Sequence, residues 1–137
     1  MVTVLDRLAA LHEYLDHLRA LRSRVTDPEA LRGDLSLSNN VCHSLQVICQ
    51  AVIDIAGDLS VRRQRRFESY SAAIQNLSAF SEFPAPLVRD LEVLPELRDS
   101  IVHRSWALDY ARLIEALDHL QPIEQFAEIV RQIEAAS

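Results

Sequence analysis

Residues 36–59 form one long segment in which apolar side chains recur at every third or fourth position. This spacing is typical of an α-helix, because side chains three and four positions apart lie on the same helical face. The apolar stripe is wide and includes Val41, Leu45, Ile48 and Val52. A helix with so broad an apolar face is expected at the centre of a helical bundle.

The remaining sequence also favours helices. Two glycines and five prolines in 137 residues, with 6% aromatic residues, argue against a turn-rich β fold. This length corresponds to one domain. We therefore predict a single all-α domain over residues 1–137, an antiparallel bundle of about five helices without repeats.

Helical periodicity and turn residues place the other elements. Pro28 and Gly33 bracket a turn or a single helical turn, and the Asp109 carboxylate is a predicted N-cap. We expect helices over Val4 to about Arg24, within 67–80, from 84–86 through 98–103, from Asp109 to Leu117, and over 123–133.

Charge and cysteine content limit the function classes. The net charge is −6 and all 14 basic residues are arginines, so binding to nucleic acid requires a local basic patch. On a helix, Cys42 and Cys49 lie about 10 Å apart, beyond disulfide reach, and are expected to be buried. No second Cys/His pair has zinc-site spacing, so we predict no metal and no cofactor.

The sequence gives no membrane or export signal. We find no apolar run approaching the roughly 18 residues that would span a bilayer, and no basic region followed by an apolar stretch at the N-terminus. We expect a cytoplasmic protein that does not bind membranes.

The segment RDSIVH, residues 98–103, carries the clearest chemistry. Arg98 and His103 are five positions apart, so on an ideal helix they point about 140° apart unless the helix breaks or the arginine wraps round. If they converge, histidine can move a proton and arginine can bind a phosphate, which suffices to cleave RNA without a metal. The alternative is a histidine at a helix end and an arginine paired with Asp99.

Three stretches, LQVICQAVIDIAGDL, FESYSAAIQNL and LRDSIVHRSWALD, together resemble the HepT-like proteins of the HEPN superfamily over residues 34–133. The resemblance implies a helical homodimer acting as the endoribonuclease toxin of a toxin–antitoxin pair, neutralised by a minimal nucleotidyltransferase. It also implies that Arg98 and His103 of each subunit are the catalytic pair and that Asp99 orients one of them. A non-catalytic HEPN module that binds a nucleotidyltransferase or a nucleotide is the alternative.

The sequence departs from this family two positions after the histidine. The family usually has a tyrosine there, which the partner adenylylates, whereas this chain has Ser105. A serine hydroxyl is shorter and far less acidic than a phenol. Ser105 and the nearest downstream tyrosine, Tyr110, are the candidate modification positions.

Several residues outside the motif remain candidates. The VRRQRR segment either stabilises a helix C-terminus or forms a patch for RNA or an acidic partner. Trp106 either stacks on a base or packs in the core or an interface. Asp54 either faces a helix edge or pairs with an arginine such as Arg98. The candidate contacts in VRRQRR are Arg62, Arg63, Arg65 and Arg66.

Overall fold

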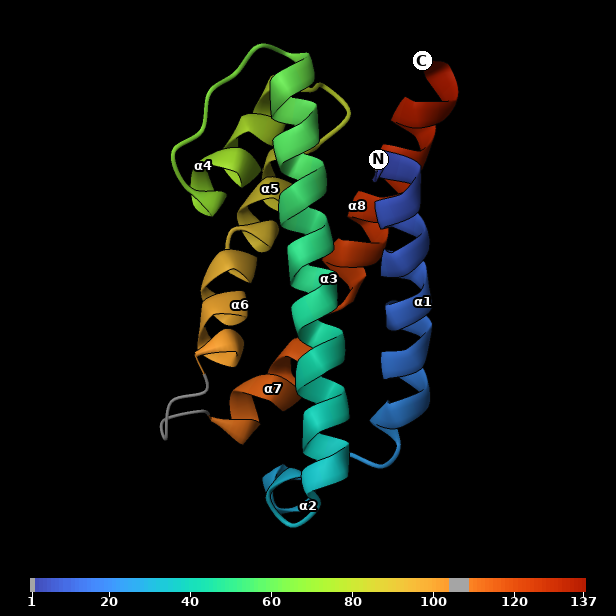
Figure 1. The fold of residues 1–137 in the computed structure, drawn as a ribbon, viewed down its shortest axis with the longest axis vertical. Coiled ribbons are helices and arrows are strands. Elements are labelled where there is room, and N and C mark those ends of the chain that lie inside the picture. The colour runs from blue at the N-terminus through green and yellow to red at the C-terminus, as the bar shows by residue number, and fades with distance from the viewer. Residues whose placement is uncertain (1, 104–108) are drawn as a thin grey trace.

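The computed structural model describes residues 2–103 and 109–137, and these ranges are helical with no strand (Figure 1). The predicted all-α fold is confirmed. The described residues form more and shorter helices than predicted: α1 Val4–Arg22, α2 Pro28–Arg32, α3 Leu35–Arg62, α4 Tyr70–Gln75, the 3₁₀-helix η1 Asn76–Ala79, α5 Ala85–Leu91, α6 Leu94–Val102, α7 Tyr110–Leu117 and α8 Gln121–Ala136.

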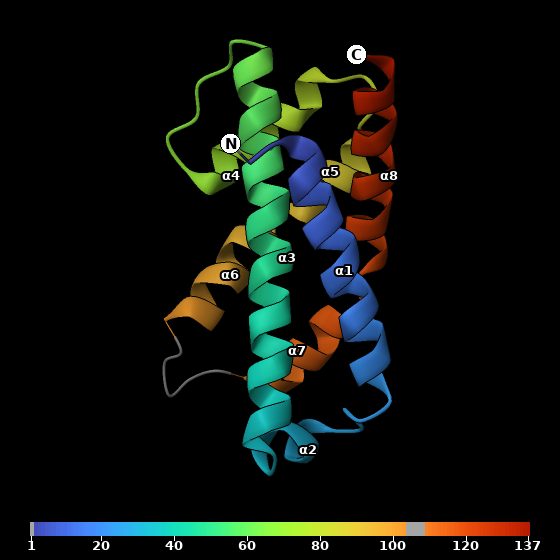
Figure 2. The same ribbon diagram turned by 45° about the vertical axis from the view of Figure 1, so that its right-hand side comes forward.

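Helix α3 is the central element, as its apolar stripe predicts. It packs against α1, α2, α4 and α6, and Figures 1 and 2 show it running the length of the molecule between α1 and α6. The Asp34 carboxylate caps its first turn by accepting from the Leu37 amide at 3.0 Å. The buried side chains of α3 form one core with those of the surrounding helices.

The predicted helical stretch from 84–86 to 98–103 is two helices. α5 ends at Leu91 and α6 begins at Leu94, with Pro95 in its first turn. Proline has no N–H to donate to the Leu91 carbonyl, so an uninterrupted helix would lose a hydrogen bond at that point. The break allows α5 to pack against α8 while α6 packs against α3.

Helix α3 is also long and apolar enough, by length and composition, to cross a membrane, which the sequence analysis did not anticipate. However, 67% of its most apolar window is buried inside the domain. Its apolar face contacts α1 and α6, so the apolar composition serves the core of the bundle.

Candidate functional site

Arg98 lies on α6, where the helix packs on α3. Leu94, Leu97 and Ile101 bury the inner face of α6, and Arg98 emerges at the edge of that contact with 23% of its side chain exposed. Its guanidinium is therefore held by protein on one side and open to solvent on the other. That environment suits an arginine that binds an anion.

Three groups hold the Arg98 guanidinium. Its Nε donates to Gln50 Oε1 at 3.0 Å, and its Nη1 donates to Asp99 Oδ1 at 3.1 Å. Its central carbon lies 5.4 Å from the centre of the Tyr70 ring, within the range of a cation–π contact. Gln50 is on α3 and Tyr70 begins α4, so three helices meet at Arg98.

His103 caps the C-terminal end of α6 and is exposed. Its backbone remains right-handed helical, with φ −82° and ψ −8°, and its N–H donates to the Asp99 carbonyl at 3.0 Å. The backbone from Arg98 to His103 therefore stays helical. In such a helix the two residues point about 140° apart around the axis, and their Cα atoms are about 7.5 Å apart along it. The helix does not break between them, so it does not bring the two side chains together within one chain.

Asp99 was predicted to orient either the histidine or the arginine. Its side chain is 55% exposed and contacts Arg98, whereas its backbone carbonyl accepts from the His103 amide. This exposed ion pair contributes little to stability, because solvent screens it. Of the two predicted partners, the Asp99 side chain therefore contacts the arginine.

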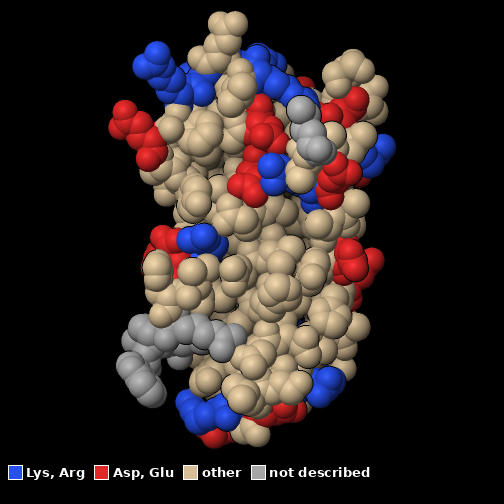
Figure 3. All heavy atoms as spheres, in the orientation of Figure 1, with Lys and Arg blue, Asp and Glu red and all other residues tan. Residues whose placement is uncertain are grey.

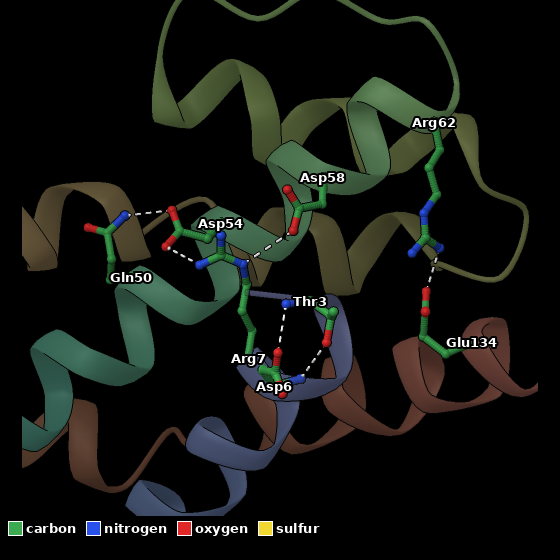
Figure 4. A network of polar contacts seen from close by, with 8 residues as sticks. All are labelled: Thr3, Asp6, Arg7, Gln50, Asp54, Asp58, Arg62 and Glu134. Carbon is green, nitrogen blue, oxygen red and sulfur yellow. Dashed lines mark hydrogen bonds and ion pairs between the residues drawn. The ribbon is translucent and has the colours of Figure 1, made fainter. Parts of the chain in front are cut away.

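A chain of polar contacts extends from Gln50 to α1 (Figure 4). Gln50 Nε2 donates to Asp54 Oδ1 at 2.9 Å, and Asp54 Oδ2 accepts from Arg7 Nη1, also at 2.9 Å. Arg7 Nε in turn donates to Asp58 Oδ2 at 3.2 Å. Asp54 thus pairs with Arg7, and among the residues that the structure describes its link to Arg98 runs through Gln50.

Sequence reasoning missed Gln50 and Tyr70. Gln50 and Asp54 are four residues apart and share one face of a helix whose other faces are largely apolar. That spacing could have indicated a hydrogen bond between the two side chains, and with it a role for Gln50. Tyr70 follows the basic segment, and nothing in the sequence placed it beside Arg98.

The four arginines of the VRRQRR segment divide into two pairs. Arg62 pairs with Glu134 of α8, a hydrogen bond that raises the pKa of Arg62, and Arg63 lies 4.3 Å from the centre of the Phe80 ring. The exposed side chains of Arg65 and Arg66 have no such partner among the described residues. Figure 3 shows basic side chains gathered at the end of the molecule where α3 ends.

The candidate modification residues are only partly placed. Tyr110 begins α7, is half-buried, and has the Arg32 guanidinium 5.6 Å from its ring centre. Asp109 caps this helix as predicted, accepting from the Ala111 amide at 2.9 Å. Ser105 and Trp106 lie outside the described residues.

A cavity of about 400 Å³ lies between α3, α5, α6, α7 and α8, with Leu97, the residue before Arg98, in its wall. Cys49 is in its wall, and burial raises the pKa of that thiol to about 12, so the sulfur is neutral. Neither Arg98 nor His103 lines this cavity. In the described part of the chain, no group of three or more His, Cys, Asp or Glu residues is placed to bind a metal ion.

Comparison with known proteins gives one family. The model of a family described as Ribonuclease HepT-like matches residues 11–133. A Shewanella oneidensis protein named mRNA nuclease HepT is 23% identical over 130 residues, which cover 93% of this chain and 96% of that protein.

Solved structures share the fold. A crystal structure of a toxin-antitoxin with AMP-PNP aligns at a TM-score of 0.82 and 22% identity, covering 94% of this chain and 97% of its own. A tri-AMPylated Shewanella oneidensis HEPN toxin in complex with MNT antitoxin aligns at 0.83 and 21% identity, covering 94% and 96%. At these identities the structures establish the architecture.

Proposed function

The chain belongs to the HepT-like ribonuclease family, and from this premise we propose that it is the toxin of a toxin–antitoxin pair that cleaves RNA without a metal ion. The enzyme class, an endoribonuclease, follows from the family. The toxin role is supported by the relatives described as a HEPN toxin and an mRNA nuclease.

We propose that Arg98 and His103 perform the cleavage. The imidazole takes the proton of a ribose 2′-hydroxyl, whose oxygen then forms a bond to the adjacent phosphorus. The bond from phosphorus to the 5′-oxygen breaks, and a protonated imidazole gives that oxygen a proton. Arg98 binds the phosphate and stabilises the negative charge that develops on its oxygens. Asp99 orients the arginine through its contact at 3.1 Å.

One observation carries this assignment: the Arg98 guanidinium is fixed by Gln50 and Asp99 while still partly exposed, and the exposed His103 follows on the same helix. A guanidinium has five N–H donors, and these two hydrogen bonds use two of them. No other described residue accepts a hydrogen bond from Arg98, which leaves the remaining donors for a phosphate.

We propose that the active enzyme is a homodimer. Within one chain the two motif side chains diverge around the helix, so a single subunit does not pair its own Arg98 with its own His103. A twofold axis next to α6 would bring two copies of the motif face to face and double the positive charge in the cleft. A chain with a net charge of −6 needs such a local concentration of positive charge to bind RNA.

We propose that the neutralising partner is a minimal nucleotidyltransferase and that both proteins are cytoplasmic. The related complex with an MNT antitoxin contains an AMPylated toxin, which supports a nucleotidyl-transferring partner. Ser105 and Tyr110 are the proposed acceptor positions here. Trp106 is proposed to contact the RNA or the partner.

The toxin role is tested by growth. Induced expression of this chain in a bacterium is expected to arrest growth, and co-expression of a cognate nucleotidyltransferase is expected to restore it. The Arg98→Ala variant, expressed to the same level, should permit growth. Unimpaired growth with the wild-type chain would favour the non-catalytic binding module instead.

The arginine segment gives a second prediction. The double variant Arg65→Glu/Arg66→Glu is expected to weaken RNA binding by about tenfold or more at low salt, because two exposed charges that could meet phosphates are reversed. The turnover number at saturating RNA should stay within about twofold, since neither residue contacts Arg98 or Asp99. Fluorescence anisotropy with a 2′-deoxy-substituted RNA measures the affinity.

The matched control is Arg131→Glu, which reverses an exposed charge on α8 that already pairs with Glu128. We expect its RNA affinity to stay near that of the wild type. Equal weakening by both variants would show that net charge, and not this segment, governs RNA binding.

A further inference from the structure

We propose that Gln50 of α3 is the positioning residue for Arg98, and that Asp54 and Arg7 fix the orientation in which Gln50 acts. This inference rests on the proposed function, because it concerns how the arginine is prepared for a phosphate. Gln50 contacts the Arg98 guanidinium at Nε. It would affect the reaction by orienting Arg98, without touching the RNA itself.

The contacts define which way the Gln50 amide points. Asp54 Oδ1 is an acceptor and lies 2.9 Å from Gln50 Nε2, so the amide nitrogen must face Asp54. The amide oxygen is then directed at Arg98 Nε, 3.0 Å away. The opposite orientation would set the amide nitrogen against the Arg98 donor and the amide oxygen against a carboxylate, so both hydrogen bonds would be lost.

Asp54 is itself held in place. Arg7 donates to Asp54 at 2.9 Å and to Asp58 at 3.2 Å; the side chains of Arg7 and Asp54 are 26% and 32% exposed, and that of Asp58 is 41% exposed. Figure 4 shows Asp54 and Asp58 on successive turns of α3, with Arg7 reaching both from α1. Hydrogen bonds thereby connect the Arg98 guanidinium to α3 and, through Arg7, to α1. Hydrogen bonds in such a chain orient one another.

The neutral amide of Gln50 has a specific consequence for charge. Asp54 already has a cationic partner in Arg7, and Gln50 separates it from Arg98. Arg98 therefore receives an oriented acceptor at Nε without a carboxylate at that edge. Within residues 2–103 and 109–137, the one carboxylate in direct contact with Arg98 is that of the exposed Asp99, at Nη1. A phosphate thus meets a guanidinium that is fixed but still available for charge-assisted hydrogen bonds.

Two substitutions separate orientation from charge. Gln50→Met keeps a side chain of similar length but removes both hydrogen bonds, so Arg98 loses its fixed orientation. Gln50→Glu keeps an acceptor for Arg98, but it loses the donor to Asp54 and adds a negative charge between Arg98 and Asp54. The matched control is Gln46→Met, which is one turn earlier on α3, half-buried, and without a side-chain hydrogen bond to any described residue.

The experiment measures kcat and KM for RNA cleavage by the full chain in EDTA, with thermal unfolding of each variant. We expect Gln50→Met to lower kcat by about tenfold or more, because a misplaced catalytic group reduces the rate steeply. Gln50→Glu should also lower kcat, although it can still accept from Arg98, whereas Gln46→Met should match the wild type. If Gln50 were purely structural, either substitution would change kcat only in proportion to the folded protein that is lost, as thermal unfolding reports it.

Affinity for a 2′-deoxy-substituted RNA completes the test. Gln50→Met should weaken binding in the wild-type background and change it no further when Arg98 is already alanine, because the two residues act as one unit. Equal weakening in both backgrounds, or wild-type kcat in folded Gln50→Met, would overturn the inference while leaving the proposed function intact. Failure of the wild-type chain to cleave RNA would instead overturn the proposed function and this inference with it.

Discussion

Replacement of His103 by alanine is expected to lower the rate of RNA cleavage by about 10²- to 10⁴-fold, the usual contribution of a positioned general acid or base. His103 is exposed at the end of α6, so its imidazole can reach a substrate. The last turn of α6 is held by a hydrogen bond from the His103 backbone amide to the Asp99 carbonyl. Alanine keeps this amide, so the fold should be preserved. The measurement is the initial rate on a fluorescent RNA at several concentrations of protein.

The control for this substitution is His12→Ala, an exposed histidine on α1. Its cleavage rate should equal that of the wild type. A His103→Ala variant that keeps more than about a tenth of the wild-type rate would contradict the role given to the imidazole, since so small a loss is below the range for general acid–base catalysis.

Replacement of Phe126 by alanine is expected to reduce the free energy of unfolding by about 3–5 kcal/mol, as is typical for a fully buried aromatic residue. Phe126 is 0% exposed, and its ring stacks on that of Phe83 with 5.7 Å between centres. Its removal would leave a cavity where α8 packs against the rest of the core. Urea denaturation followed by circular dichroism gives the change.

Phe67→Ala serves as the comparison, because this ring is 39% exposed and lies outside the core cluster. We expect it to cost clearly less than Phe126→Ala, because part of the ring is already in contact with water. Comparable losses for the two variants would contradict the packing described for α8.

The fold could be predicted from the sequence wherever apolar periodicity was strong. The stripe through Val41, Leu45 and Ile48 correctly placed α3 at the centre, and the Asp109 cap was correct because capping depends on residues next to each other in sequence. The division between α5 and α6 was missed. Its signal was Pro95, whose missing N–H interrupts the helix.

The sequence could predict only those residues of the candidate site that lie in one short segment, 98–103. Arg98, Asp99 and His103 stand together in the sequence, and the structure places the first two in contact. The contacts of Arg98 with Gln50 and Tyr70 join residues far apart in the chain, and no local pattern encodes them. Likewise, the pairing of Arg62 with Glu134 depends on where α8 ends, so the sequence could not tell the engaged arginines from Arg65 and Arg66.

The most direct test of the proposed chemistry is the identity of the RNA ends made by the purified chain in excess EDTA. Attack by the 2′-oxygen predicts products with a 2′,3′-cyclic phosphate on one fragment and a 5′-hydroxyl on the other, resolved by mass spectrometry. Arg98→Ala protein prepared in parallel should make neither product at a comparable rate. Intact RNA with the wild-type chain, or fragments that carry a 5′-phosphate, would contradict metal-independent cleavage by Arg98 and His103.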